Sequence, residues 1–151
     1  MTSSRACTVI HEVRPNLWIG SLQGASEALQ KPHSSFTHAV SCIEICPRLR
    51  QGIVQLHIPV SDNPDESLLA HFQTVCEFIN QAHQNQGKVI VHCEQGISRS
   101  AALIAAHLIQ HEDMNVKQAL LAVYSAKPAA KVNPWFVRDL VDWHQHHVLN
   151  S

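Results

Sequence analysis

The stretch that decides the fold is residues 89–100, which read Val89-Ile90-Val91-His92-Cys93-Glu94-Gln95-Gly96-Ile97-Ser98-Arg99-Ser100. An apolar run leads into it, and a continuous apolar segment from about residue 98 to residue 111 leads out of it. This pattern predicts a buried strand, a tight loop and a long helix. Backbone N–H groups at the start of such a helix can point at a tetrahedral oxyanion, so we expect an anion-binding loop.

Cys93 and Arg99 stand at the two ends of this loop, with five residues between them. The guanidinium of Arg99 is a planar fork suited to two phosphate oxygens. The helix dipole and Arg99 both favour a thiolate over a thiol at Cys93. A nucleophile and an oxyanion receptor therefore share one loop, whose predicted substrate-binding residues are Glu94, Gln95, Gly96, Ile97, Ser98 and Arg99.

The pattern Cys-x5-Arg-Ser, after a His and a buried strand, resembles the signature loop of the cysteine-dependent protein phosphatases. Within that superfamily the chain resembles the small, atypical dual-specificity phosphatases over nearly its whole length. The matching segments are 16–21 (NLWIGS), 54–59 and Lys127-Pro128 followed by Asn133 and Phe136. Val132 and Trp135 depart from the family pattern, which has Pro and Gly there. We expect these departures to alter helix packing or a surface near the pocket and to leave the chemistry untouched.

Hydrophobic periodicity predicts one α/β domain over residues 1–151, with a catalytic core at about 9–149. Strands are expected at 8–13, 17–20, 37–43, 53–60 and 89–92, and helices at 21–30, 67–83, 98–111, 115–126 and from 133 onward. The resemblance implies a protein tyrosine phosphatase-like fold, in which a central, mostly parallel, twisted sheet is flanked by helices. The signature loop then lies at the carboxyl end of a central strand, where open α/β sheets bind ligands.

Phosphate-ester hydrolysis also needs a general acid, because the departing oxygen leaves poorly unless it is protonated. In the family this acid is an Asp on a loop after the preceding strand, and Asp62 occupies that place. Its neighbours Asp65 and Glu66 are interpreted as acids at the opening of the next helix, where the helix dipole favours them.

The resemblance gives roles to further residues. Ser100 is expected to hydrogen-bond the sulfur and to assist its departure from the phosphoenzyme. His92 and Asn133 are expected to support the loop structurally, with Asn133 also at the N-cap of the last helix. Cys42 has two interpretations: a resolving thiol for Cys93, or a buried small apolar residue.

Composition narrows the functional class. The 151 residues carry a formal net charge of −1, which argues against a nucleic-acid binder. Five cysteines without a disulfide-framework spacing indicate a reducing compartment, so we expect a cytoplasmic or nuclear location. Residues 1–7 lack the apolar core of a signal peptide, and no apolar stretch has membrane-spanning length. The twelve histidines show no zinc spacing, and His144, His146 and His147 are interpreted as surface residues.

The sequence leaves three alternative functions open. The first is a metal-free, cofactor-free phosphatase of phosphoproteins, acting on phosphotyrosine and phosphoserine or phosphothreonine through a cysteinyl-phosphate, with a monomer favoured. The second is a phosphatase of a phosphoinositide, an RNA 5′ end or a phosphoglucan. Glu94 and the lack of Lys within the loop argue against it. The third is a non-catalytic phosphopeptide-binding relative, which would be expected to have lost Cys93 or Arg99.

Overall fold

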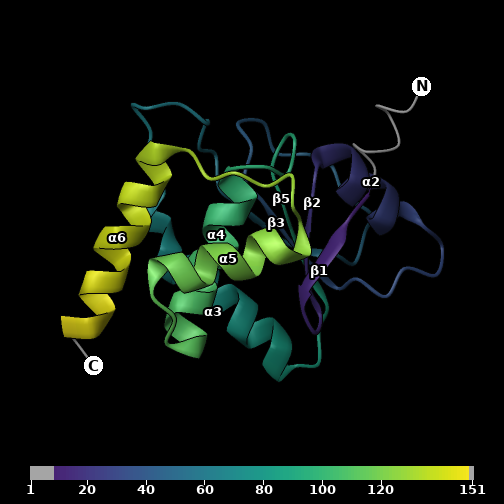
Figure 1. The fold of residues 1–151 in the computed structure, drawn as a ribbon. Helices are drawn as coiled ribbons and strands as arrows, with labels where there is room; N and C mark the ends of the chain where they lie inside the picture. The colour runs from purple at the N-terminus through teal and green to yellow at the C-terminus, as the bar shows by residue number, and fades with distance from the viewer. Residues whose placement is uncertain (1–8, 150–151) are drawn as a thin grey trace.

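The computed structural model describes residues 9–149, and a five-stranded sheet forms the centre of this part of the chain (Figure 1). The strands are β1 (His11–Arg14), β2 (Leu17–Gly20), β3 (His38–Ser41), β4 (Val54–His57) and β5 (Val89–His92). Their order is β1-β2-β5-β3-β4; β1 pairs antiparallel with β2, and the remaining pairings are parallel. The mostly parallel sheet with the 89–92 strand at its centre is confirmed. Thr8, placed in the first expected strand, lies outside the described residues.

Helices cover both faces of this sheet. They are α2 (Leu22–Gln30), α3 (Leu69–Gln84), α4 (Arg99–Glu112), α5 (Val116–Ala126) and α6 (Pro134–Leu149). One core forms under α2, where Ile90 packs with Leu29 and Phe36. Val89 and Val91 point to the opposite face and belong to the larger core beneath the remaining helices. Alternate residues of β5 thus serve two cores, which explains why its sequence is continuously apolar.

The central helix α4 is buried on every side. Its residues from Arg99 to Ile109 are all buried, and it contacts α3, α5 and α6. A helix that is apolar all round belongs in the interior, as its sequence predicts. The loop that precedes it is therefore attached to two rigid, buried elements, β5 and α4.

Two helix starts follow the local sequence. Asn115 and Gln118 form the expected capping box of α5, with the Asn115 side chain accepting from Gln118 N at 2.8 Å. Ser21 caps α2 by accepting from Gly24 N at 3.0 Å.

The start of α3 differs from the expectation. The helix begins at Leu69 rather than residue 67, and its first turn carries no acidic residue. The carboxylate of Asp139 on α6 accepts hydrogen bonds from Leu68 N at 2.9 Å and Ser67 Oγ at 3.1 Å. Asp65 and Glu66, interpreted as acids at the opening of this helix, therefore lie before its first turn, and the buried Asp139, 71 residues away from Leu68 in sequence, accepts the bonds at the helix start.

Strands β3 and β4 are shorter than expected. They end at Ser41 and His57, so residues 42–46 and 58–68 leave the sheet at its carboxyl edge. Both segments reach the signature loop: the first carries Glu44, which bonds Arg99, and the second carries Asp62, which lines the pocket.

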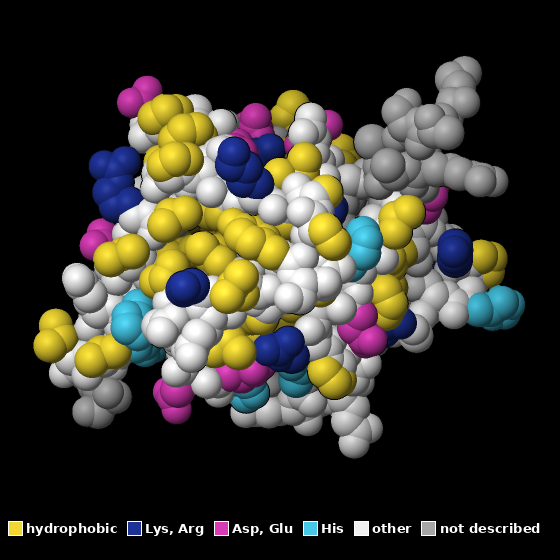
Figure 2. Space-filling view, viewed as in Figure 1, with side chains coloured by type: hydrophobic (Ala, Val, Ile, Leu, Met, Phe, Trp, Pro, Cys, Tyr) yellow, Lys and Arg dark blue, Asp and Glu magenta, His cyan; other side chains and the backbone are white. Residues whose placement is uncertain are grey.

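The surface seen in Figure 2 has hydrophobic side chains gathered in a hollow between α5 and α6. Exposed apolar residues in the described range include Leu121 on α5 and Val141 on α6. No helix within residues 9–149 combines the length and apolar character needed to cross a membrane.

The cap from Asp139 yields a stability prediction. Asp139→Ala should lower the free energy of unfolding by about 1–2 kcal/mol, because it removes the acceptor for the Leu68 amide and the Ser67 hydroxyl. Chemical denaturation measures this change. Asp142→Ala, at an exposed site on the same helix, is the control and should change stability far less. Equal effects of the two variants would show that the cap contributes nothing.

Candidate active site

The signature loop lies between the end of β5 and the start of α4, at the carboxyl edge of the parallel strands. Gly96 gives it its shape, because its φ of +71° is one that other residues rarely adopt. A Cβ on Gly96 would also lie 2.6 Å from the carbonyl carbon of Gly20. Backbone bonds from Leu22 N to Glu94 O and from Lys131 N to Ile97 O, both 3.0 Å, hold the two limbs of the loop.

Cys93 lies at the base of a pocket of about 350 Å³. Its side chain is buried, and its Sγ lies 3.2 Å from the Oγ of Ser100. The pocket is lined by Asp62, Cys93, Glu94, Gln95, Ile97, Ser98, Arg99, Lys131 and Asn133. The structure thus brings together most of the predicted site residues. Gly96 is absent from the lining because it packs at the back of the loop, and Lys131 is a pocket residue that the sequence analysis missed.

Arg99 is anchored by two segments that follow neighbouring strands. Its Nη1 donates to Glu44 Oε1 at 2.6 Å and to Val60 O at 2.9 Å. Its Nε is buried and has no hydrogen-bond partner among the described residues. One end of the guanidinium is therefore fixed, and a donor at the other end remains for an oxyanion.

The Arg99–Glu44 ion pair shifts both groups toward their charged forms. Burial alone would lower the pKa of Arg99, but the hydrogen bond with Glu44 and the nearby charges raise it overall. The same hydrogen bond lowers the pKa of the exposed Glu44 carboxyl. The sequence did not predict a role for Glu44, because an acid two residues after Cys42 does not by itself indicate a contact with Arg99.

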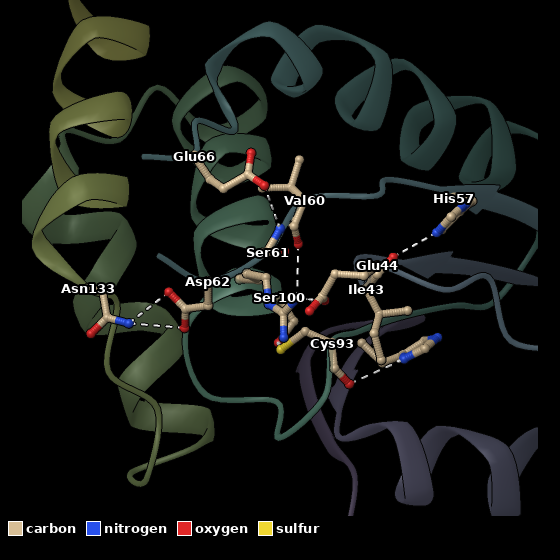
Figure 3. A network of polar contacts seen from close by, with 12 residues as sticks. Ile43, Glu44, His57, Val60, Ser61, Asp62, Glu66, Cys93, Ser100 and Asn133 are labelled. Atoms are coloured by element: carbon tan, nitrogen blue, oxygen red, sulfur yellow. Dashed lines mark hydrogen bonds and ion pairs between the residues drawn. The ribbon is translucent and has the colours of Figure 1, made fainter. Parts of the chain in front are cut away.

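Asp62 lines the pocket two residues after Val60, and Figure 3 shows its carboxylate facing Asn133, away from Glu44. The side-chain amide of Asn133 donates to both of its carboxylate oxygens, at 2.8 and 3.0 Å. The indole Nε1 of Trp135 donates to Oδ1 at 3.0 Å. We expected Trp135 to act only on packing or the nearby surface. The structure places this residue near the pocket, as expected, and in addition bonds its N–H to the predicted acid.

The neighbouring acids, Asp65 and Glu66, point away from the pocket. Glu66 Oε1 accepts a long bond of 3.4 Å from Ser61 N, and Asp65 is exposed. Neither lines the pocket, whereas Asp62 does.

His92 is buried directly beneath the loop. Its Nε2 shares a 2.6 Å hydrogen bond with Ser41 Oγ, and its Nδ1 lies 3.4 Å from Cys93 O. Burial lowers the pKa of His92 to about 4, so the ring is neutral near pH 7. A buried, neutral and hydrogen-bonded His92 fits a structural role beneath the loop better than a role in proton transfer.

Cys42 lies beside Cys93 on the neighbouring strand end. Ser41 and His92 are paired in register, and Cys42 N donates to His92 O at 2.9 Å. Adjacent strands are about 4.8 Å apart, which falls within the Cα separation a disulfide spans. Burial, and next the charge of Cys93, raise the pKa of the Cys42 thiol to about 12. A thiol that resists ionisation is a poor resolving nucleophile, which favours packing; the redox role stays a prediction.

Over residues 9–149, no group of three or more His, Cys, Asp or Glu side chains is arranged to hold a metal ion. Two of the C-terminal histidines, His146 and His147, contact Trp143 as well as each other. The His146 ring stacks on its indole and the His147 ring meets it edge-on, with centroids 6.2 and 4.3 Å away.

Comparison with known proteins agrees with this geometry. The model of the dual specificity phosphatase catalytic domain matches residues 17–146. Dual specificity phosphatase 28 of Homo sapiens is 36% identical over 125 residues, covering 82% of this chain and 71% of that protein. Dual specificity protein phosphatase 22 of Homo sapiens is 30% identical over 139 residues, covering 92% of this chain and 76% of that protein.

Solved structures agree as well. The crystal structure of human DUSP28 superposes with a TM-score of 0.87 at 32% identity, covering 93% of this chain and 99% of that one. A mouse putative dual specificity phosphatase complexed with zinc tungstate superposes with a TM-score of 0.86 at 32% identity, covering 95% and 91%.

The α/β fold, with a Cys-x5-Arg loop at the carboxyl end of its central strand, is that of a cysteine-dependent protein phosphatase domain. The family match makes the class more specific. The chain belongs to the dual specificity phosphatase family, and its relatives are named as dual specificity protein phosphatases.

The buried histidines predict a pH-dependent stability. Burial lowers the pKa of both His92 and His107 to about 4. Between pH 6.5 and about 4 the unfolded chain therefore binds more protons than the folded one, and stability falls as the pH is lowered through this window. Each histidine contributes up to about 1.4 kcal/mol per pH unit there.

Denaturation at several pH values checks this. His107→Leu removes one of the two groups without touching the pocket, so the loss of stability on acidification should become shallower. An unchanged slope in that variant would contradict the account.

Proposed function

We propose that this chain hydrolyses phosphotyrosine and phosphoserine or phosphothreonine in proteins through a phosphate ester on Cys93. The observation that carries the proposal is the placement of three side chains, Cys93, Arg99 and Asp62, around one pocket. The Cys93 sulfur lies 3.2 Å from the Ser100 hydroxyl, and Arg99 is anchored by Glu44.

In the first step the Cys93 thiolate attacks phosphorus in line with the leaving oxygen, and the S–P bond forms as the P–O bond breaks. Arg99 offers Nε and Nη2 to two equatorial oxygens, because Nη1 is held by Glu44 and Val60. The backbone N–H groups of residues 94–99 supply the remaining donors. Asp62 gives its proton to the departing oxygen.

In the second step water attacks the phosphocysteine, and the Asp62 carboxylate accepts the proton that the water loses. The S–P bond breaks and Cys93 leaves as a thiolate. Ser100 donates its hydroxyl hydrogen bond to that sulfur, which their 3.2 Å separation supports. Phosphate is released and the site returns to its starting state.

The charges around the pocket support a substrate with a single phosphate group. Arg99 and Lys131 are offset by Asp62 and Glu94 in the lining. A multiply charged phosphoinositide or RNA end would gain little from such a balanced pocket. A phosphorylated protein residue, presented as one dianion, fits it better.

We also propose that the chain works as a monomer in the cytoplasm or nucleus. A reducing compartment keeps a catalytic thiolate from oxidation. The described cysteines carry free thiols, including the adjacent Cys42 and Cys93.

The nucleophile is tested by Cys93→Ser. We expect this variant to lose turnover of phosphotyrosine and phosphothreonine peptides, measured with a metal chelator present, because its hydroxyl is a far weaker nucleophile. It should still bind tungstate, a tetrahedral oxyanion, because Arg99 and the loop backbone remain. Cys46→Ser, at an exposed cysteine outside the pocket, is the matched control and should retain activity. Substantial residual hydrolysis by Cys93→Ser would remove the covalent step from the mechanism.

A further inference from the structure

The two oxygens of the Asp62 carboxylate have different surroundings. Oδ1 accepts two hydrogen bonds, from Asn133 Nδ2 at 2.8 Å and from Trp135 Nε1 at 3.0 Å. Oδ2 accepts one, also from Asn133 Nδ2, at the longer distance of 3.0 Å. When such a carboxyl is protonated, its carbonyl oxygen can keep two N–H donors, whereas its hydroxyl oxygen cannot face them without losing a bond. The proton is therefore best placed on Oδ2.

The donor that creates this asymmetry stands at a departure from the family pattern. Asn133 contacts both oxygens and cannot by itself distinguish them. Trp135 stands where the family resemblance has Gly, which has no side-chain donor. The indole ring is half-buried and meets Phe136 edge-on at 6.2 Å, so its N–H is held in a fixed direction.

We propose that Trp135 is a positioning residue that sets the substrate preference of this site, by occupying Oδ1 of Asp62 and leaving the proton on Oδ2 for delivery to the leaving oxygen. The inference rests on the proposed role of Asp62 as general acid. As the P–O bond breaks, the proton passes from Oδ2 to the leaving oxygen. Oδ2 later takes a proton from the attacking water, so the site is restored.

The consequence is that the enzyme should favour substrates whose leaving group is basic. An alkoxide from phosphoserine or phosphothreonine is a poor leaving group and needs its proton during departure, whereas an activated aryl oxide needs it far less. Precise placement of the acid therefore benefits alkyl phosphates most. Trp135 should raise the activity toward phosphothreonine relative to an activated aryl phosphate.

The experiment compares kcat/KM for a phosphothreonine peptide and for para-nitrophenyl phosphate in five proteins: the parent, Trp135→Phe, Asp62→Asn, the double variant of these two, and Trp18→Phe. Trp135→Phe keeps an aromatic ring against Phe136 and removes the N–H donor. Trp18→Phe is the matched control, because the Trp18 indole nitrogen has no hydrogen-bond partner among the described residues. Free energies of unfolding are measured for all five.

Trp135→Phe should lose up to about tenfold on the phosphothreonine peptide, the loss expected for one hydrogen bond to a neutral acceptor, and less than about twofold on the aryl phosphate. Trp18→Phe should match the parent on both substrates. Introduced into Asp62→Asn, Trp135→Phe should have no further effect, because the group it positions is gone.

The outcomes separate the two claims. If Asp62→Asn discriminates strongly between the substrates but Trp135→Phe affects both equally or neither, the inference about Trp135 is overturned and the proposed function stands. If Asp62→Asn itself fails to discriminate, the acid role of Asp62 falls, and the inference falls with it. An additive effect of Trp135→Phe in the Asp62→Asn background would also overturn the inference, since it would show a role independent of Asp62.

Discussion

The site depends above all on the buried guanidinium of Arg99. Its Nη1 joins three segments that are distant in sequence: the signature loop, the segment after β3 through Glu44, and the segment after β4 through Val60. Burying a charge is costly unless it is paired and hydrogen-bonded. Without these acceptors the buried charge of Arg99 would be unpaired, so the side chain would be more stable in solvent and the pocket would lose its main oxyanion donor. The same contact therefore stabilises the loop surroundings and directs the remaining donors toward the substrate.

The surroundings of Asp62 are built in a comparable way, from another part of the chain. Asn133, directly before α6, and Trp135, in its first turn, donate hydrogen bonds to Asp62. Further along the same helix, Asp139 caps α3, the helix that follows that loop. Residues at and near the start of α6 therefore hold Asp62, and Asp139 on the same helix holds the start of α3, where the Asp62 loop ends. Arg99 and Asp62 share the segment after β4, through Val60, but the contacts from Glu44 and from α6 are separate, so substitutions can perturb those one at a time.

Local signals explain why much of the fold could be predicted from sequence. The limits of β2 and β5 match the expected ranges, and the α5 capping box is present, because each depends on neighbouring residues. The juxtaposition of Cys93, Arg99 and Ser100 also follows from one short loop. The missed features are long-range. Glu44 lies 55 residues from Arg99, and Trp135 lies 73 residues from Asp62. Neither belongs to a local pattern, and both contacts exist only because the sheet and α6 are assembled.

The central claim, that Glu44 holds Arg99 in its oxyanion-binding position, is tested most directly by measuring tungstate affinity and kcat/KM together in Glu44→Ala. Loss of a charge-assisted bond should weaken both by about tenfold or more. Glu77→Gln, at an exposed glutamate on α3, should change neither. Parallel losses in oxyanion affinity and turnover, with unfolding free energy near that of the parent, are the result this account predicts. Parent-like tungstate binding and turnover in Glu44→Ala would contradict it.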